Sequence, residues 1–344
     1  MIGCATRMAC ADDAAAILAL GVASPCADFT FYRRYGHDFA VDYLSFELRR
    51  FLRESDAVAV VATAGDEIIG FAGARPSPWE SGHFAIPMAT SAFLLSAARA
   101  ERAATVTALL PAIERLLLDR GVAMLTMRID ASDLAAHRAV QGRGYFHADT
   151  MLTHLLEAYP APCRYPHIDP AYVATSYAPD RFHEVDRDEL APLSDFMSKA
   201  FRTDRYHADP RLPVARSDAL YAEWFRNAFE GAWADGIHIV RKHGRLVGFC
   251  CFKQLKDVLD RYGVNIVGRY VTCALPDGRG GAMSCLVDAC YRSCPCGSAF
   301  SEYDMVVQNL PAINTAINHG CHLVRTRYTY HCWLRPARRR RRSS

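Results

Sequence analysis

Apolar and polar residues in the second half of the chain follow an order that predicts a hairpin, a third strand and then a helix. Two β-rich runs, 237–241 and 246–252, are joined by four residues that include Gly244, as a hairpin connection requires. A third run, 266–274, precedes a glycine-rich loop and residues 283–292, whose apolar side chains recur with helical spacing. The prediction is completed by a strand, a helix and a strand region over 299–307, 311–319 and 323–334.

The first half of the chain repeats this succession. A hairpin, a third strand region, a helix, a strand, a helix and a final strand are expected over 57–74, 85–95, 103–120, 124–129, 133–141 and 149–156. Pro111 either kinks the long helix or marks its start. Four landmarks recur at offsets of 176, 178, 176 and 176, namely Asp12 with Asp188, Ile69 with Val247, Asp133 with Asn309, and Gly144 with Gly320. This near-constant offset predicts a duplicated domain.

The domain boundary is expected near residue 160. Residues 159–180 contain five of the seventeen prolines, which oppose both helix and sheet continuation, so we interpret them as a linker. A chain of 344 residues is long enough for two cores. We therefore expect domains over 1–158 and 181–335, a tail over 336–344, and an α+β fold in which each domain has a largely antiparallel central sheet flanked by helices.

The net charge of +3 does not describe the folded part of the chain, because five of the positive charges belong to the consecutive residues Arg338 to Arg342. Subtracting these five charges leaves −2, so we expect no specific nucleic-acid binding by the folded part. The arginine run predicts a solvated, disordered tail, and a weak contact with nucleic acid or membrane is the alternative. No apolar run is long enough to span a membrane, and Arg7 interrupts any secretory signal, so a cytoplasmic protein without membrane contact is expected.

The thirteen cysteines are an odd number and lie in apolar surroundings in both halves. This pattern favours reduced thiols in the core. Cys294 and Cys296 flank Pro295, but no second matched pair accompanies them, so no metal site is expected.

The loop after the third strand carries the most specific chemical signal. A strand that ends in Gly278-Arg279-Gly280-Gly281 and opens a helix presents bare N–H groups and the positive end of the helix, which suit a pyrophosphate. A tight turn that needs its glycines is the structural alternative. Rossmann and P-loop domains place such a loop after their first strand, and a Walker lysine is absent, so neither fold is expected.

Two motifs in the second half resemble a known family. Pro276, Arg279-Gly280-Gly281 and Leu286 are similar to the acyl-CoA pyrophosphate loop of the GNAT superfamily of acyltransferases, and Asn309, Ala312 and Gly320 resemble its Asn-x-x-Ala helix. The resemblance implies tandem GNAT-like domains and transfer of an acetyl group from acetyl-CoA to an amine of a small molecule. Residues 205–211 and 328–334 look most like the N-acetyltransferases that act on dTDP-4-amino-4,6-dideoxygalactose, which suggests an amino-sugar nucleotide as acceptor.

The chain also departs from the family pattern. Its loop is one residue short, Ala316 stands where the family often has a tyrosine as general acid, and Cys321 follows Gly320 in place of phenylalanine. In the first half, residues 96–102 contain no glycine and include an acid, Glu101. We therefore expect the first domain to be a degenerate copy that binds no cofactor and walls the acceptor site, and His83 and His137 to be structural.

The resemblance, together with position along the chain, assigns candidate roles. Acetyl-CoA is expected to contact the backbone near the thioester and the glycine loop, through Val271, Thr272, Cys273, Gly278, Arg279, Gly280, Gly281 and Ala282. Asn309 either orients the cofactor or caps its helix. Glu302 and Asp304 alternate with Tyr303, so they share a strand face and are candidates for the base. Tyr328 and Tyr330 either replace the missing acid or are half-buried sheet residues.

Two other functions fit the same residues. The short loop and Ala316 also suit a non-catalytic acyl-CoA-binding or regulatory protein on this scaffold. A peptide or protein N-acetyltransferase is the third reading, because the fold does not choose the acceptor. The sequence leaves open the acceptor, the acyl chain and the oligomeric state, a homodimer included.

Overall fold

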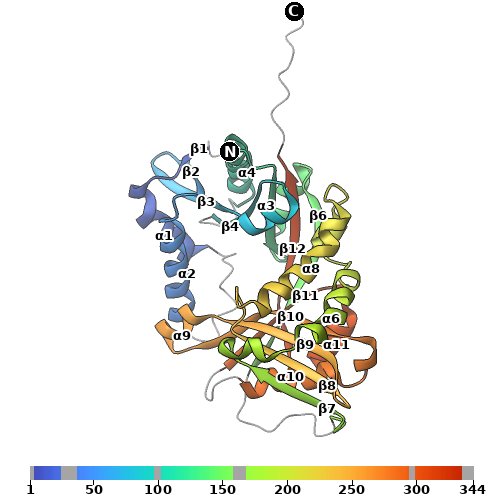
Figure 1. Cartoon of the computed structure of the whole chain (residues 1–344). Coiled ribbons are helices and arrows are strands. Elements are labelled where there is room, and N and C mark those ends of the chain that lie inside the picture. Colours follow the sequence, from blue (N-terminus) through green and yellow to red (C-terminus); the bar gives the residue numbers. More distant parts are fainter. Residues whose placement is uncertain (1–3, 25–36, 97–101, 158–167, 294–298, 335–344) are drawn as a thin grey trace, which may run out of the picture. The chain divides into compact units, whose positions relative to one another are not determined.

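The structure is a computed structural model that describes residues 4–24, 37–96, 102–157, 168–293 and 299–334. It divides into two compact units. Unit 1 consists of Met1–Ala148 with Arg327–Ser344, and unit 2 consists of Asp149–Thr326. Most of the elements are labelled in Figure 1. The predictions that concern Cys294 and Cys296, residues 97–101 and the tail 336–344 fall outside the described residues.

Unit 1 contains a mixed sheet in the order β1-β2-β3-β4-β5 followed by part of β12. All neighbouring pairs are antiparallel except β4 and β5, which run parallel where Met88–Thr90 pairs with Met124–Thr126. Its strands are β1 (Ala5–Met8), β2 (Val58–Ala64), β3 (Glu67–Pro76), β4 (Met88–Ser96) and β5 (Met124–Asp130), and its helices are α1 (Ala14–Ala23), α2 (His37–Phe51), α3 (Pro78–Phe84), α4 (Arg102–Asp119) and α5 (Leu134–Gly142).

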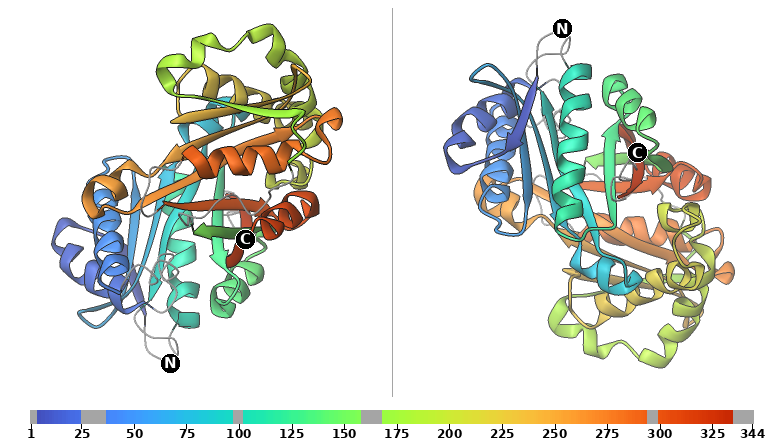
Figure 2. Two further views of the ribbon diagram at one scale, coloured as in Figure 1. Left: turned by 90° about the horizontal axis from the view of Figure 1, so that it is seen from below. Right: turned by 90° about the horizontal axis from the view of Figure 1, so that it is seen from above.

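Helices cover both faces of the unit 1 sheet. Val60 of β2 belongs to a core cluster with Leu109 of α4, whereas Val61 belongs to a second cluster with Leu48 of α2. Successive residues of a strand point to opposite faces, so α4 lies on one face, and α1 and α2 lie on the other (Figure 2). α4 continues through Pro111, which therefore does not mark its start.

Unit 2 has the sheet order β6-β11-β10-β9-β8-β7. Ile239 and Phe249 pack with α6 and α8, while Val240 and Cys250 pack with α10 on the opposite face. Its strands are β6 (Phe146–Glu157), β7 (Tyr172–Tyr177), β8 (Gly236–Lys242), β9 (Arg245–Gln254), β10 (Asn265–Ala274), β11 (Ala299–Val306) and the first part of β12 (His322–Trp333), and its helices are α6 (Arg187–Ala200), α7 (Arg205–Ala208), α8 (Val214–Phe229), α9 (Lys256–Tyr262), α10 (Ala282–Ser293) and α11 (Leu310–Asn318).

The last strand of each sequence repeat pairs in the unit built mainly from the other repeat. Residues 327–333 of β12 pair antiparallel with Met124–Asp130 of β5, within unit 1. Residues 151–157 of β6 pair antiparallel with residues 300–306 of β11, within unit 2. Each unit therefore includes a strand from each repeat.

The α+β fold with largely antiparallel sheets and flanking helices is confirmed. The predicted hairpin at residues 242–245 is present, and His243 and Gly244 both have positive φ, as its tight turn requires. The predicted linker is only partly described, and its residues Tyr172–Tyr177 form strand β7 of unit 2. β1, α2, α3, α7 and α9 are elements that the sequence pattern did not predict. None of the described helices is both long and apolar enough to cross a membrane.

Candidate functional site

Strands β10 and β11 pair only at their beginnings. The parallel ladder joins Asn265–Val267 to Ala299–Ser301, whereas β10 continues to pair with β9 as far as Ala274. A β-bulge lies in β10 between Gly268 and Val271, which face Lys253 and Cys251 of β9. Beyond Val267, the backbone of β10 on the β11 side is thus outside the β10–β11 ladder. Bulges often occur beside active sites, where they redirect the chain.

Glu302 lies where the two strands separate. It follows Ser301, the last residue of β11 that pairs with β10, and a Cβ built on Gly268 would lie 3.5 Å from the Cβ and 3.9 Å from Oε2 of Glu302. The half-buried carboxylate therefore sits against β10 at the start of the bulge. Of the two predicted bases, Glu302 is the one that the structure places here.

Asp304 has a different set of contacts. Its side chain is exposed, and Oδ1 accepts a hydrogen bond of 2.6 Å from Thr153 Oγ1 on the paired strand β6. The intervening Tyr303 packs with Leu156 and Ala316 on the other face of the strand. The predicted alternation along β11 is thus confirmed.

The glycine loop follows β10 directly and combines two uses of glycine. A Cβ at Gly278 would lie 2.8 Å from the carbonyl oxygen of Val247, and one at Gly281 would lie 2.4 Å from the ring of Tyr172. Both glycines are therefore required by close packing, and Gly280 is required by its φ of +90°. Close packing and backbone conformation together explain these three glycines, which is the structural alternative that the sequence left open.

The loop nevertheless ends at a helix N-terminus. α10 begins at Ala282, and the N–H groups of Ala282, Met283 and Ser284 have no preceding helical turn to supply acceptors. Arg279, just before the helix, is exposed. The loop thus has the donors and the cation that an anionic ligand requires.

The predicted thioester-binding residues lie on the bulged part of β10. Thr272 Oγ1 donates a hydrogen bond of 3.1 Å to Cys250 Sγ, and the Val271 carbonyl oxygen accepts one of 3.5 Å from Cys251 Sγ. Cys273 is buried, and burial raises the pKa of its thiol to about 12. Cys273 is consequently a neutral core thiol near pH 7.

Asn309 caps helix α11. Its side chain accepts a hydrogen bond of 3.3 Å from the backbone N–H of Ala312, which is the second of the two roles considered for this residue. Ala316, where the resembling family often has tyrosine, is buried in a cluster with Leu156 and Cys321. The α11 side chain at position 316 therefore has a packing role.

Tyr328 and Tyr330 belong to unit 1 and pair with β5 of that unit. The Tyr330 hydroxyl lies 3.1 Å from Nδ1 of His137, and burial raises the pKa of Tyr330 and lowers that of His137. Tyr328 packs against the rings of His137 and His147. These tyrosines thus belong to unit 1, whereas the glycine loop belongs to unit 2, and their use as general acids stays a prediction.

The histidines expected to be structural have packing contacts. His137 also lies 2.9 Å from the carbonyl oxygen of Asp130 through Nε2. His83 is buried in α3 and stacks on Trp79, with 5.5 Å between ring centroids. Both histidines are thus held in unit 1 by neighbouring groups.

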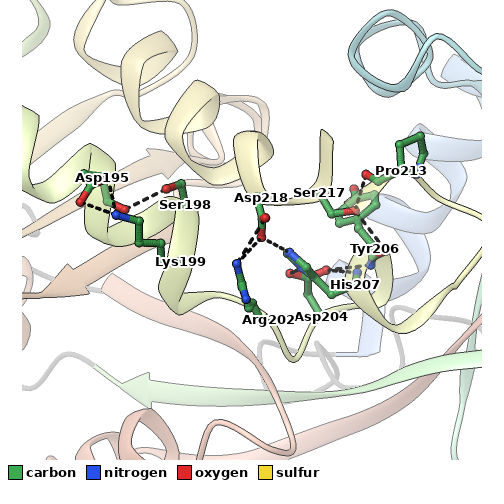
Figure 3. Close-up of polar contacts among 10 residues, drawn as sticks. All are labelled: Asp195, Ser198, Lys199, Arg202, Asp204, Tyr206, His207, Pro213, Ser217 and Asp218. Carbon is green, nitrogen blue, oxygen red and sulfur yellow. Dashed lines mark hydrogen bonds and ion pairs between the residues drawn. The ribbon is translucent and has the colours of Figure 1, made fainter. Parts of the chain in front are cut away.

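Residues 205–211, which carry part of the family resemblance, make polar contacts with their own surroundings. Figure 3 shows those of Tyr206 and His207. Asp204 caps α7 and lies 2.9 Å from Nδ1 of His207, while Nε2 of His207 lies 3.2 Å from Asp218 of α8. Arg211 forms two bonds, of 2.8 and 3.0 Å, to the buried carboxylate of Asp209. The contact between His207 and Asp218 joins α7 to α8, and the contacts together give the segment a structural role.

Unit 1 differs from unit 2 at α4, the helix that corresponds to α10 of unit 2. Arg102, the first residue of α4, is buried, and its Nε lies 2.8 Å from both carboxylate oxygens of Asp133. A pocket between β4 and β5 is lined by both residues of this pair, together with Leu44, residues 91–95 and residues 128–130. Residues 97–101, including Glu101, lie outside the described part of the chain.

Comparison with solved structures identifies the fold. A GCN5-related N-acetyltransferase from Sphaerobacter thermophilus is 17% identical with a TM-score of 0.58, and the match covers 97% of this chain and 96% of that one. A tandem GNAT protein from the clavulanic acid biosynthesis pathway is 14% identical with a TM-score of 0.52, and the match covers 97% and 100%. No protein-family model and no curated protein sequence matches the chain. The chain thus has the fold of tandem GNAT proteins.

Proposed function

We propose that unit 2 is an N-acetyltransferase that moves an acetyl group from acetyl-CoA to the amine of a small molecule. The observation that carries the proposal is the separation of β10 from β11 directly before a glycine loop, with Glu302 at the point of separation. The two similar structures support a GNAT-type reaction, since both are described as GNAT proteins.

The proposed reaction uses backbone groups for the cofactor and a carboxylate for the acceptor. The N–H groups of the loop and of the first turn of α10 would hold the diphosphate of acetyl-CoA. A backbone N–H of the bulged strand, in the range 271–273, would bind the thioester oxygen as negative charge develops on it. Glu302 would accept the proton of the acceptor ammonium, directly or through water, so that the neutral amine attacks the carbonyl carbon.

The leaving group needs little assistance. A thiol of pKa about 8.5 leaves as a thiolate near neutral pH and takes a proton from water afterwards. General acid catalysis contributes about 10²- to 10⁴-fold in rate, and a chain with Ala316 in place of the usual tyrosine should lose an amount near the lower end. We therefore expect slow turnover rather than none.

The acceptor that we propose is an amino-sugar nucleotide. The support is the sequence resemblance at residues 205–211 and 328–334, although the structure gives many of these side chains internal contacts. A screen of amino-sugar nucleotides against peptide amines, read as thiol release from acetyl-CoA, tests the choice. Turnover of peptides alone would favour the peptide N-acetyltransferase instead.

Titration with acetyl-CoA tests the cofactor site. We expect saturable binding at one site per chain, weakened at least 10-fold by Arg279→Glu, because the change replaces a cation by an anion beside the diphosphate. Arg226→Glu is the matched control, since Arg226 is an exposed arginine on α8. Equal binding by both variants would contradict the site.

One alternative function has a specific observation in its favour. The buried Ala316 removes the usual acid, which suits a protein that binds acyl-CoA without using it. Binding of acetyl-CoA without turnover of any amine in the screen would establish that alternative.

A further inference from the structure

Tyr172 connects β7, the edge strand of the unit 2 sheet, to the glycine loop. It begins β7, pairs with Lys242 of β8 and is 7% exposed. It belongs to a core cluster that includes Ala282, Cys285 and Leu286 of α10. The residue thus lies between the edge of the sheet and the helix that the loop opens.

Two contacts tie Tyr172 to the loop itself. Its hydroxyl donates a hydrogen bond of 3.1 Å to the carbonyl oxygen of Arg279. Its ring occupies the space beside Gly281, because a Cβ at that position would lie 2.4 to 2.7 Å from three ring atoms. The ammonium of Lys242 lies 4.9 Å from the ring centroid, which adds a cation–π contact. The ring is therefore held from several sides.

The bond to Arg279 also fixes the direction of a neighbouring donor. The carbonyl of Arg279 and the N–H of Gly280 belong to one planar trans peptide, in which they point in opposite directions. Because the carbonyl is directed to Tyr172, the Gly280 N–H is directed away from it. Within the described part of the chain, no backbone carbonyl accepts a hydrogen bond from this N–H.

We propose that Tyr172 is a positioning residue that orients the Gly280 N–H toward the diphosphate of coenzyme A. This inference rests on the proposed function of unit 2. The loop is one residue shorter than in the family that it resembles, and the Tyr172 hydroxyl supplies a fixed point within the shortened loop. Gly281 is then glycine because it accommodates the ring, and Gly280 is the residue whose backbone meets the ligand.

Tyr172→Phe removes the hydroxyl and keeps the ring. Loss of one such bond corresponds to about a 3- to 10-fold weaker affinity for coenzyme A, measured by calorimetry, with little change in the melting temperature. Tyr177→Phe is the matched control, because Tyr177 ends the same strand and is also largely buried. The control is expected to bind coenzyme A as the wild type does.

A second pair of variants tests the ring. Gly281→Ala should weaken binding of coenzyme A at least 10-fold, because its Cβ meets the ring. Adding Tyr172→Ala removes the obstruction, so the double variant should bind more tightly than Gly281→Ala alone. A double variant that binds no better than Gly281→Ala would contradict the role of the ring.

A readout without ligand separates this inference from the proposed function. Amide hydrogen exchange across residues 276–284 should be faster in Tyr172→Phe than in wild type, because the loop loses its fixed point. If the wild type binds no coenzyme A, the proposed function fails, and the inference about the diphosphate fails with it. Faster amide exchange in Tyr172→Phe would still show in that case that Tyr172 orders the loop. If the wild type binds and Tyr172→Phe matches it in affinity, the inference alone is wrong.

Discussion

Arg102 and Asp133 form a buried ion pair in unit 1, at the start of α4. Asp133 also caps α5 through a hydrogen bond of 3.2 Å from the N–H of Ala136. At the offset of 176 residues, these positions correspond to Gly278 and Asn309 of unit 2, and Asn309 caps its helix in the same way. Unit 1 thus has its own cation and anion where unit 2 has a glycine and a neutral cap. This difference supports the proposal that unit 1 binds no cofactor.

Removing one partner of this ion pair should destabilise the protein more than removing both charges. Arg102→Met leaves the carboxylate of Asp133 buried without its cation, so unfolding by urea should show a loss of about 3 to 5 kcal/mol. Arg102→Met combined with Asp133→Asn removes the uncompensated charge and keeps the cap, so it should lose less than the single variant. A double variant as unstable as the single one would show that the charge is not the cause.

Glu302 should be needed for turnover and dispensable for cofactor binding. Glu302→Gln removes the proposed base and keeps the shape of the side chain, so the acetylation rate should fall about 10²- to 10⁴-fold with acetyl-CoA affinity nearly unchanged. Asp304→Asn is the control, because Asp304 is exposed and bonded to Thr153. If Asp304→Asn causes the larger loss, the assignment of the base moves to that residue.

His238 should make the protein less stable in acid. It is buried in unit 2, with Nδ1 lying 2.9 Å from Ser176 Oγ, and burial lowers its pKa to about 4. Between pH 6.5 and 4 the unfolded chain binds a proton that the folded chain excludes, so the free energy of unfolding falls as the pH falls, by about 3 kcal/mol over this range.

Denaturation at several pH values checks this prediction. His238→Gln has no titrating ring, so its free energy of unfolding should depend less on pH between 6.5 and 4 than that of the wild type. Burial also lowers the pKa of His137, His154 and His319, so part of the dependence should remain in the variant. An identical dependence in both proteins would contradict the assignment.

Cys250 and Cys290 should form a disulfide under oxidation. Their sulfur atoms lie 3.5 Å apart in the core between β9 and α10, and a bonded pair needs about 2.05 Å. Diamide takes up the two thiol hydrogens as the sulfur–sulfur bond forms, and the chain loses two mass units. Peptide mapping should find the Cys250–Cys290 link, more slowly than oxidation of the exposed Cys10 because both thiols are buried. The same link should be absent from Cys290→Ser, and cross-links through Cys273 instead would contradict the prediction.

Local pattern was sufficient for much of the fold. The hairpins, the glycine loop before α10 and the recurrence at 176 residues follow from alternation, helical spacing and turn residues, which act over a few neighbouring positions. The face shared by Glu302 and Asp304 followed in the same way from the two-residue period of a strand. Tyr172 was missed because prolines dominate its segment, although the run 172–177 contains the β-branched and aromatic residues typical of a strand.

The sequence by itself therefore determined the types and order of most elements and the recurrence of landmarks at a near-constant offset. Only the tertiary structure decided which strands pair. It showed that β6 and β12 each complete the unit that is built mainly from the other repeat. It also decided that Tyr328 and Tyr330 belong to unit 1 and that Tyr172 contacts Gly281. The physical reason is that strand pairing and side-chain contacts depend on interactions between residues far apart in the chain. The local periodicity of the sequence contains no information about those interactions.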